Sequence, residues 1–136
     1  MSHADEAVVM VVGADSDFWY LMRRYLRKAS HLRVVTLTQE EALARATAEQ
    51  PAAILLETDA PGPECWDVLR ALKATRATRH IPVIVCSWLD VRQRSLDAGA
   101  DRFLRKPVLH EDLVAVLVDL GIRPATHAAS GTAGAA

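Results

Sequence analysis

The stretch "AAILLETDAPG", residues 52–62, gives the clearest indication of how this chain folds. Its apolar run at 54–56 has no polar interruption and stops abruptly at Glu57. A continuous apolar run is typical of a strand that is buried on both faces, as in a parallel sheet. The Pro-Gly pair at 61–62 then indicates a turn. A strand of this kind that ends in a carboxylate raises the question of what the carboxylate does there.

Strand-like runs and stretches of helical period alternate on both sides of this segment. The expected strands are 7–12, 32–37, 52–57, 81–87 and 101–106, and the expected helices are 18–28, 38–50, 65–73, 89–99 and 111–121. The order is therefore strand then helix, repeated through the chain. With right-handed crossovers it predicts an α/β fold, a doubly wound parallel five-stranded sheet with helices on both faces.

The composition fits one domain with its own core. The chain has 136 residues, of which 51% are hydrophobic, and a net charge of −1 that argues against a nucleic-acid partner or an anionic membrane surface. No apolar run approaches the ~20 residues of a membrane span. The acidic start "MSHADEAVV" is unlike a secretory signal, so we expect a cytoplasmic protein. We expect a domain at 1–122 and a disordered tail or linker at 123–136.

In a parallel sheet of this type, ligands and chemistry gather at the carboxyl ends of the strands. Here those ends carry Gly13 and Ala14, Glu57, Ser87 and Lys106. The helix patterns add local signals. Thr38 followed by Glu41, for example, has the form of a capping box.

Three stretches, taken in order and at their spacing, resemble the response-regulator receiver domain, the CheY-like phosphoacceptor module of two-component signalling. They are "PAAILLETDAPG" at 51–62, "TRHIPVIVCS" at 78–87 and "LDAGADRFLRKP" at 96–107. The resemblance runs from about Ala7 to Gly121 and implies the flavodoxin/CheY-like fold. In that family an aspartate ends the third strand and takes a phosphoryl group, while an acidic pair after the first strand holds Mg²⁺.

Some family positions match and others do not. Ser87 stands where a hydroxyl hydrogen-bonds a phosphoryl oxygen, Lys106 stands before a proline where a lysine pairs with its charge, and Phe103 takes the place of the switch aromatic. Glu57, however, occupies the phosphoacceptor position. Gly13 and Ala14 replace the acidic pair, and only the next residue, Asp15, is acidic. The resemblance thus implies an atypical pseudo-receiver without a cofactor, in which Mg²⁺ binding is absent or weak.

Two physical arguments oppose efficient phosphorylation. Glutamate moves the carboxylate outward by ~1.5 Å, about one C–C bond, and reaction geometry tolerates little misplacement. Without a metal, two unit charges at ~4 Å repel by roughly 4 kcal/mol at an effective dielectric of ~20. This corresponds to about three decades in rate. We therefore expect no enzyme activity.

Two interpretations of Glu57 stay open, and both make Lys106 its partner. In the first, Glu57 pairs with Lys106 and mimics a phosphorylated state. In the second, it only neutralises Lys106 in a decayed site, because Glu carries one charge where a phosphorylated side chain carries about two. The second is the simpler explanation.

The remaining site residues also have two explanations each. Asp15 is a residual metal ligand or, more simply, the cap of the first helix, and Ser87 binds an oxyanion or caps a helix. Phe103 is a switch or an ordinary core aromatic. Cys86 is better explained as a buried thiol than as a redox group, and the histidines have no zinc-ligand spacing.

The output side departs from related receivers. From Ser87 to Gly99 the chain is about three residues shorter than they are, so the fourth helix or its leading loop is shortened. Trp88 has two interpretations: it plugs the site or packs there, or it offers an aromatic anchor for a binding partner. Val114 and Val118 add apolar surface to the last helix and suggest a partner face, including a homodimer through the fourth and fifth helices.

The leading hypothesis is a receiver-like domain that signals by phosphorylation-independent protein binding. Its partner would be a histidine kinase, an output protein or another regulator. A first alternative is a functional phosphoacceptor of a phosphorelay that uses Glu57 or Asp59. A second is a flavodoxin-like small-ligand module, although no Gly-rich phosphate loop supports it.

Overall fold

The computed structural model describes residues 7–29, 31–59 and 64–122, and the expected tail at 123–136 lies outside them. Five parallel strands form one sheet in the order β2-β1-β3-β4-β5. The strands are β1 (Ala7–Val12), β2 (Leu32–Leu37), β3 (Ala53–Glu57), β4 (Val83–Ser87) and β5 (Arg102–Arg105). The helices are α1 (Ser16–Leu26), α2 (Gln39–Glu49), α3 (Glu64–Ala74), α4 (Arg92–Asp97) and α5 (His110–Asp119). The predicted α/β fold is confirmed.

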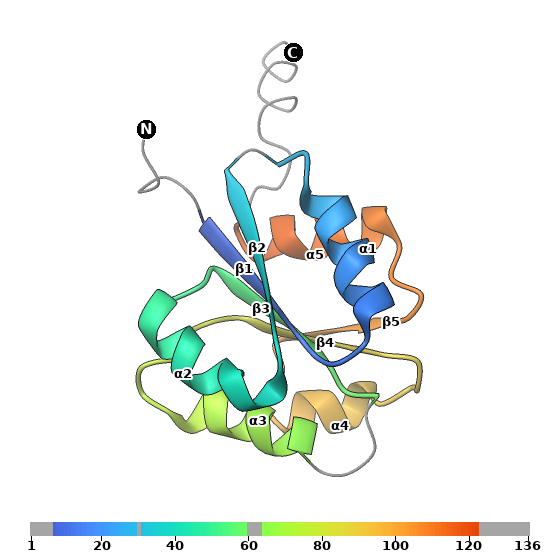
Figure 1. The fold of residues 1–136 in the computed structure, drawn as a ribbon. Coiled ribbons are helices and arrows are strands. Elements are labelled where there is room, and N and C mark those ends of the chain that lie inside the picture. Colours follow the sequence, from blue (N-terminus) through green and yellow to red (C-terminus); the bar gives the residue numbers. More distant parts are fainter. Residues whose placement is uncertain (1–6, 30, 60–63, 123–136) are drawn as a thin grey trace.

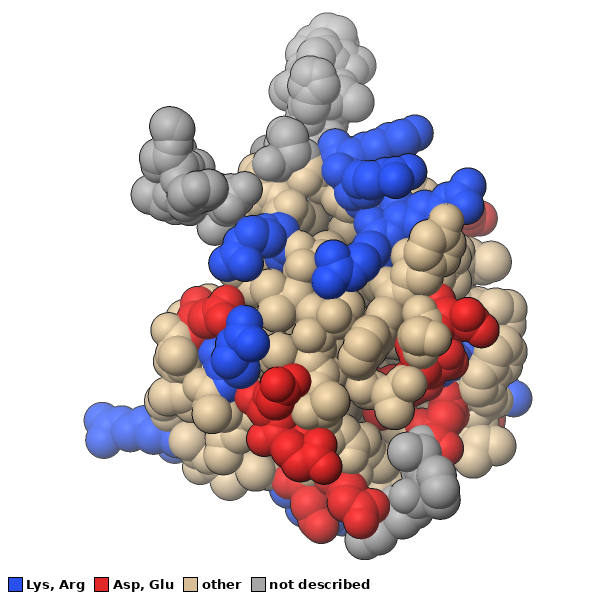
Figure 2. Space-filling view, viewed as in Figure 1, with Lys and Arg blue, Asp and Glu red and all other residues tan. Residues whose placement is uncertain are grey.

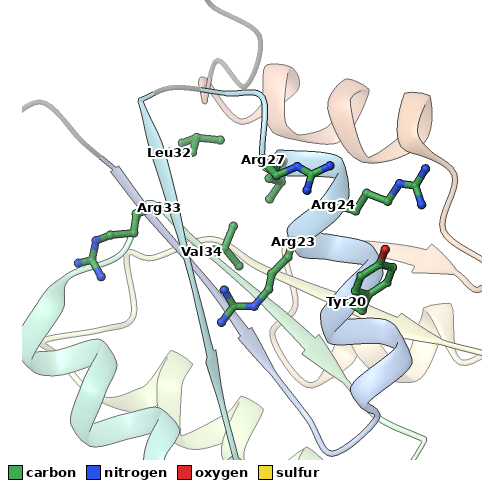
Figure 3. A pocket seen from close by; sticks show the side chains of 8 residues that line it. Tyr20, Arg23, Arg24, Arg27, Leu32, Arg33 and Val34 are labelled. Carbon is green, nitrogen blue, oxygen red and sulfur yellow. The ribbon is translucent and has the colours of Figure 1, made fainter.

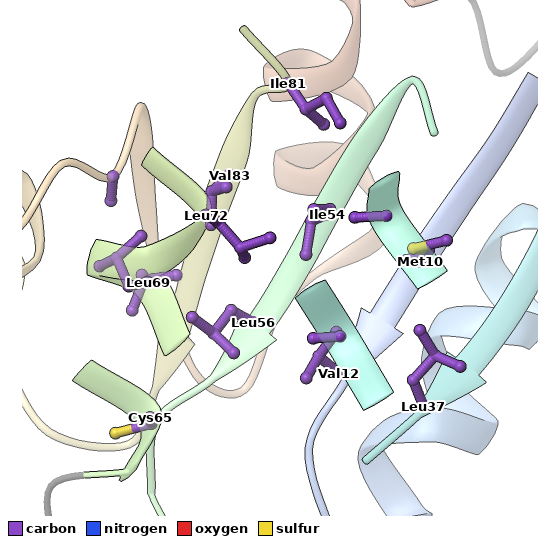
Figure 4. Packing of buried hydrophobic residues seen from close by; sticks show 14 of the residues in the cluster. Met10, Val12, Leu37, Ile54, Leu56, Cys65, Leu69, Leu72, Ile81 and Val83 are labelled. Atoms are coloured by element: carbon purple, nitrogen blue, oxygen red, sulfur yellow. The ribbon is translucent and has the colours of Figure 1, made fainter. Parts of the chain in front are cut away.

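The helices cover both faces of the sheet. Helices α1 and α5 lie on one face, and α2, α3 and α4 lie on the other (Figure 1). Alternate residues of β3 therefore enter two different cores. Ile54 and Leu56 pack in the core beneath α2 and α3 (Figure 4), and Leu55 packs in the core beneath α1 and α5. Burial on both faces explains why the run at 54–56 has no polar interruption.

Local signals in the sequence set the starts of the first two helices. Asp15 is the N-cap of α1, and its Oδ1 accepts hydrogen bonds from the backbone N–H groups of Asp17 and Phe18. Thr38 and Glu41 form the expected capping box at α2, where the Thr38 N–H donates to Glu41 Oε1 at 3.0 Å. These bonds satisfy N–H groups that have no partner inside the helix.

Helix α4 corrects one sequence expectation. The pattern predicted a helix over 89–99, but α4 spans only Arg92–Asp97. The preceding residues are held by other bonds, because the Leu89 N–H donates to Ser87 Oγ and Arg105 Nε donates to the Trp88 carbonyl. The expected shortening relative to related receivers stays a prediction, while the helix itself is shorter than the pattern indicated.

None of the helices in the described ranges is both long and apolar enough to cross a bilayer.

Candidate functional site

The candidate site lies at the carboxyl ends of β1, β3 and β4 and just beyond β5. Parallel register brings these ends together, since Glu57 of β3 pairs with Cys86 of β4 and Ser87 pairs with Arg105 of β5. Lys106 follows directly, and its N–H donates to the Ser87 carbonyl at 2.8 Å. The topology therefore assembles the site from residues that lie far apart in the sequence.

Glu57 is 5% exposed, and the structure engages both of its carboxylate oxygens. Oε1 accepts from the backbone N–H groups of Ala14 and Asp15 at 3.2 Å each, and Oε2 lies 2.6 Å from Lys106 Nζ. The space for this side chain exists because residue 13 is glycine. A β-carbon on Gly13 would lie 2.3 Å from Glu57 Oε1.

Lys106 is the cation at the centre of the site and is itself 5% exposed. Its Nζ lies 2.6 Å from Glu57 Oε2, 2.8 Å from Asp59 Oδ2 and 3.6 Å from Asp15 Oδ2. The Phe18 ring centroid lies 4.6 Å from the same nitrogen. Burial alone would lower the pKa of Lys106, but the Asp59 and Glu57 carboxylates outweigh it and raise the pKa. The expected pairing of Glu57 with Lys106 is confirmed.

Asp59 completes the site, and sequence reasoning missed this role. Its Oδ1 accepts from the Ser87 hydroxyl at 2.7 Å and from the Trp88 backbone N–H at 2.9 Å, while Oδ2 forms the ion pair with Lys106. Burial works to raise the pKa of Asp59, but Lys106, Ser87 and Trp88 outweigh it and hold the pKa below its ordinary value.

We call the Ser87 hydroxyl, the Trp88 N–H and the Lys106 ammonium the anion cradle. The first two donate hydrogen bonds to Asp59 Oδ1 and the ammonium forms an ion pair with Oδ2, so three groups from the ends of two strands converge on one carboxylate. Charge-assisted bonds of this kind are the stronger class of hydrogen bond. The cradle can hold an oxyanion, and in this structure Asp59 supplies it.

The same contacts bear on whether Mg²⁺ fits the site. Both oxygens of Glu57 are already held, by backbone N–H groups and by Lys106. Gly13 has no side chain to offer, and an ammonium ion stands among the three nearby carboxylates. Among the described residues, no three His, Cys, Asp or Glu side chains are arranged so that they could hold a metal ion. As arranged, these residues do not fit a magnesium site.

The other predicted residues lie around this centre. Asp15 caps α1, as expected, and Ser87 belongs to the cradle and is not the N-cap of α4. Phe103 is buried in the core, with the Arg92 guanidinium 5.3 Å from its ring centroid. Burial of Cys86 raises the pKa of its thiol to about 12, which fits a structural thiol.

The predicted interaction residues are only partly exposed. Trp88 is 54% exposed and lies at the edge of the site, where its ring centroid is 5.8 Å from Lys106 Nζ and its side chain lines a small pocket with Phe18. Val118 is exposed on α5, whereas Val114 is half-buried. Of the two valines, Val118 offers more surface to a partner.

Comparison with known proteins agrees with the strand-end geometry. A family model described as the response regulator receiver domain matches residues 9–118. The chain belongs to this family. It is therefore a receiver domain of the kind found in two-component signalling, as the resemblance implied.

Several curated response regulators are similar to this receiver domain in sequence. The transcriptional regulatory protein PrrA of Mycobacterium tuberculosis is 36% identical over 110 residues, which cover 79% of this chain and 46% of PrrA. The response regulator PleD of Caulobacter vibrioides is 43% identical over 70 residues, 49% of this chain and 15% of PleD. This receiver domain thus spans less than half the length of either relative.

Solved structures confirm the fold. The receiver domain of sensor histidine kinase PA1611 from Pseudomonas aeruginosa, which holds a magnesium ion in its active-site cleft, matches with a TM-score of 0.75 and 22% identity. The match covers 85% of this chain and 98% of that one. The chemotaxis protein CheY4 of Vibrio cholerae matches with a TM-score of 0.74 and 19% identity over 85% of this chain and 98% of CheY4.

Proposed function

We propose that this receiver domain signals by phosphorylation-independent protein binding, with Asp59 and Glu57 in place of a phosphoryl group. The observation that carries the proposal is the position of Asp59, whose carboxylate fills the anion cradle. In the family, a hydroxyl and a lysine at these strand ends receive the phosphoryl oxygens. Here an acid of the chain itself already engages the corresponding donors.

The charge of the site supports the mimic interpretation of Glu57. Alone, Glu57 supplies one negative charge, whereas a phosphorylated side chain supplies about two. Asp59 adds a second carboxylate at 2.8 Å from Lys106 Nζ. Together the two carboxylates place about two negative charges next to the Lys106 ammonium, which is close to the charge of a phosphorylated side chain.

The same arrangement opposes phosphoryl transfer. An incoming phosphoryl oxygen would have to displace Asp59 from Ser87 and Trp88, and it would approach two carboxylates that share one cation. Each unit charge at ~4 Å adds roughly 4 kcal/mol of repulsion at an effective dielectric of ~20. The domain would therefore act without catalysis and without Mg²⁺.

The expected partner is a histidine kinase, an output protein or another regulator of a two-component pathway in the cytoplasm. The exposed Trp88 is the best anchor for such a partner, because it lies beside the cradle and its backbone N–H is bound to Asp59. Aromatic anchors often dominate binding at interfaces. A homodimer through α4 and α5, with Val118 at its surface, is part of the same proposal.

One experiment tests the proposal on the full chain. The protein is incubated with acetyl phosphate and Mg²⁺, and its intact mass and its capture of partners from the source organism are followed. We expect no acyl phosphate and equal capture with and without the donor. The pair Glu57→Gln and Asp59→Asn, which keeps size but removes charge, should change capture. An acyl phosphate on which capture depends would overturn the proposal.

A further inference from the structure

A basic pocket lies away from the candidate site, between α1 and the edge strand β2. Its cavity volume is about 420 Å³, and it is lined by four arginines, one tyrosine and three aliphatic residues. Small-molecule sites usually have volumes of ~300–1,000 Å³. Neither the receiver chemistry nor the proposed partner surface uses this pocket.

The sequence builds the pocket from a helix face and a strand. Tyr20, Arg23, Arg24 and Arg27 follow one another at helical spacing on the exposed side of α1. Arg33 joins them from β2, which forms one edge of the sheet. Figure 3 shows Arg23 reaching from α1 toward β2, with Arg24 and Arg27 on the outer side of the helix and Val34 pointing into the space between the two elements.

The pocket concentrates positive charge in a chain whose net charge is −1. In Figure 2, Lys and Arg side chains gather over the end of α1 and the start of β2, whereas most Asp and Glu side chains lie lower on this face. Arg23 donates to the Thr36 hydroxyl at 3.3 Å, and Arg33 lies 3.7 Å from Glu49. Within the described ranges, Arg24 and Arg27 form no ion pair, so their guanidinium groups have capacity for an external anion.

The simplest explanation of this charge is local. Basic residues in the last turn of a helix interact favourably with its dipole, and exposed arginines are well solvated. That explanation covers Arg23 and Arg24, and the ion pair with Glu49 accounts for Arg33, but neither accounts for the exposed aromatic ring beside them. Tyr20 is 63% exposed, although burial of a large aromatic ring is energetically favourable.

We propose that this pocket binds a phosphate-bearing nucleotide. Guanidinium groups bind phosphate oxygens in a bidentate manner and are well suited to phosphate recognition. The exposed Tyr20 ring offers a face on which a base can stack, which adds affinity that does not depend on base identity. The aliphatic side chains between α1 and β2 supply the apolar lining that such sites commonly have. The arginines would thus bind the phosphate end of the nucleotide, and the Tyr20 ring would stack on its base.

The test is a calorimetric titration of the full chain, without magnesium, with ATP and with GTP. Inorganic triphosphate, which has the charge but no base, and hexaglutamate serve as comparison probes. We expect saturable binding of at least one nucleotide, tighter than that of inorganic triphosphate by a factor of roughly five or more, because one stacked base contributes at least this factor. In a parallel NMR titration, amide shifts should centre on Val34, and the Trp88 amide should stay unchanged.

Variants separate a built site from general charge. Arg24→Glu and Arg27→Glu should each weaken nucleotide binding by roughly tenfold, whereas the matched changes Arg76→Glu and Arg79→Glu, at exposed positions on α3's C-terminal side, should not. Tyr20→Ala should lower nucleotide affinity to that of inorganic triphosphate, and Tyr20→Phe should preserve it. Each variant's melting temperature confirms that it is folded.

Any of the following binding results would overturn the inference. They are the absence of saturable binding by either nucleotide, equal affinity for inorganic triphosphate, displacement by hexaglutamate at equal concentration, and equal weakening by the matched arginine variants. Shifts centred on Trp88 would place the ligand in the anion cradle instead and would also contradict it.

Discussion

Gly13 and Glu57 occupy a single space that accommodates only one side chain. A β-carbon on Gly13 would lie 2.3 Å from Glu57 Oε1 and 2.8 Å from its Cβ. Gly13 is not among the described residues with positive φ, so its backbone does not itself require glycine. The missing side chain after β1 and the longer acid at the end of β3 therefore fit each other. This mutual fit favours the two residues having changed together, and it argues against a site in which each position decayed independently.

The fit between these residues predicts non-additive stability. Gly13→Ala should lower the free energy of unfolding by ~1–3 kcal/mol, because the new methyl group overpacks the site. Part of this cost should disappear when Glu57→Asp removes the overlapping oxygen, with a coupling of at least ~0.5 kcal/mol. Urea unfolding of the two single variants and the double variant measures the coupling, and strictly additive changes would contradict the shared space.

Lys106 should be the residue of the site on which stability depends most. Lys106→Met leaves the Glu57 and Asp59 carboxylates facing each other without a cation, and removing one partner of a buried pair costs ~3–5 kcal/mol. The matched change Lys28→Met, at an exposed position just after α1, should alter the free energy of unfolding by no more than ~0.5 kcal/mol. Denaturant unfolding of both variants decides the point. Similar small effects would mean that the ion pairs do not stabilise the fold.

The lowered pKa of Asp59 predicts a stability loss in acid. Because the folded pKa is depressed, the stability that Asp59 contributes is fully present above its unfolded pKa of ~3.9 and is lost as the pH falls through the folded value. Asp59→Asn removes this titration. The difference in unfolding free energy between wild type and variant should therefore shrink below about pH 4. A difference that stays constant down to acid unfolding would show that Asp59 is not held as described.

Trp88 should contribute to partner binding more than to stability. Its side chain is largely exposed, so Trp88→Ala should change the free energy of unfolding by only about 0.5 kcal/mol or less. Partner capture should nevertheless fall by roughly tenfold or more, as for an aromatic anchor. Leu43→Ala, on α2, is the matched exposed control and should leave capture intact. Unchanged capture by the Trp88 variant would contradict a role of Trp88 as an anchor for the partner.

The sequence predicted the fold well because its strongest signals are local. The three central strands are mostly apolar runs, the edge strands β2 and β5 also carry arginines, and each gap between strands has a helical period. The order of elements follows from these patterns, and the pairing of Glu57 with Lys106 follows from strand-end geometry. The start of α4 could not be predicted in this way. It depends on the bond that the Leu89 N–H donates to Ser87 Oγ and on Arg105, which reaches the Trp88 carbonyl from the end of β5.

The role of Asp59 was hidden for a similar reason. It follows β3 in the sequence with no pattern of its own, and only the parallel register of β3 and β4 brings it to Ser87. The basic pocket between α1 and β2 was hidden by the net charge, which sums over the whole chain and says nothing about where charges meet. The arginines of α1 were visible as an exposed helix face, but Arg33 could be placed beside them only in three dimensions.

Occupation of the anion cradle by Asp59 is tested most directly by titrating the full chain with beryllofluoride and Mg²⁺ while following the Trp88 backbone amide by NMR. We expect no saturable shift of this resonance at millimolar Mg²⁺, because its N–H is already bound to Asp59 Oδ1 at 2.9 Å. A saturable, Mg²⁺-dependent shift would show that the cradle accepts an external phosphoryl analogue, and it would contradict the phosphorylation-independent function.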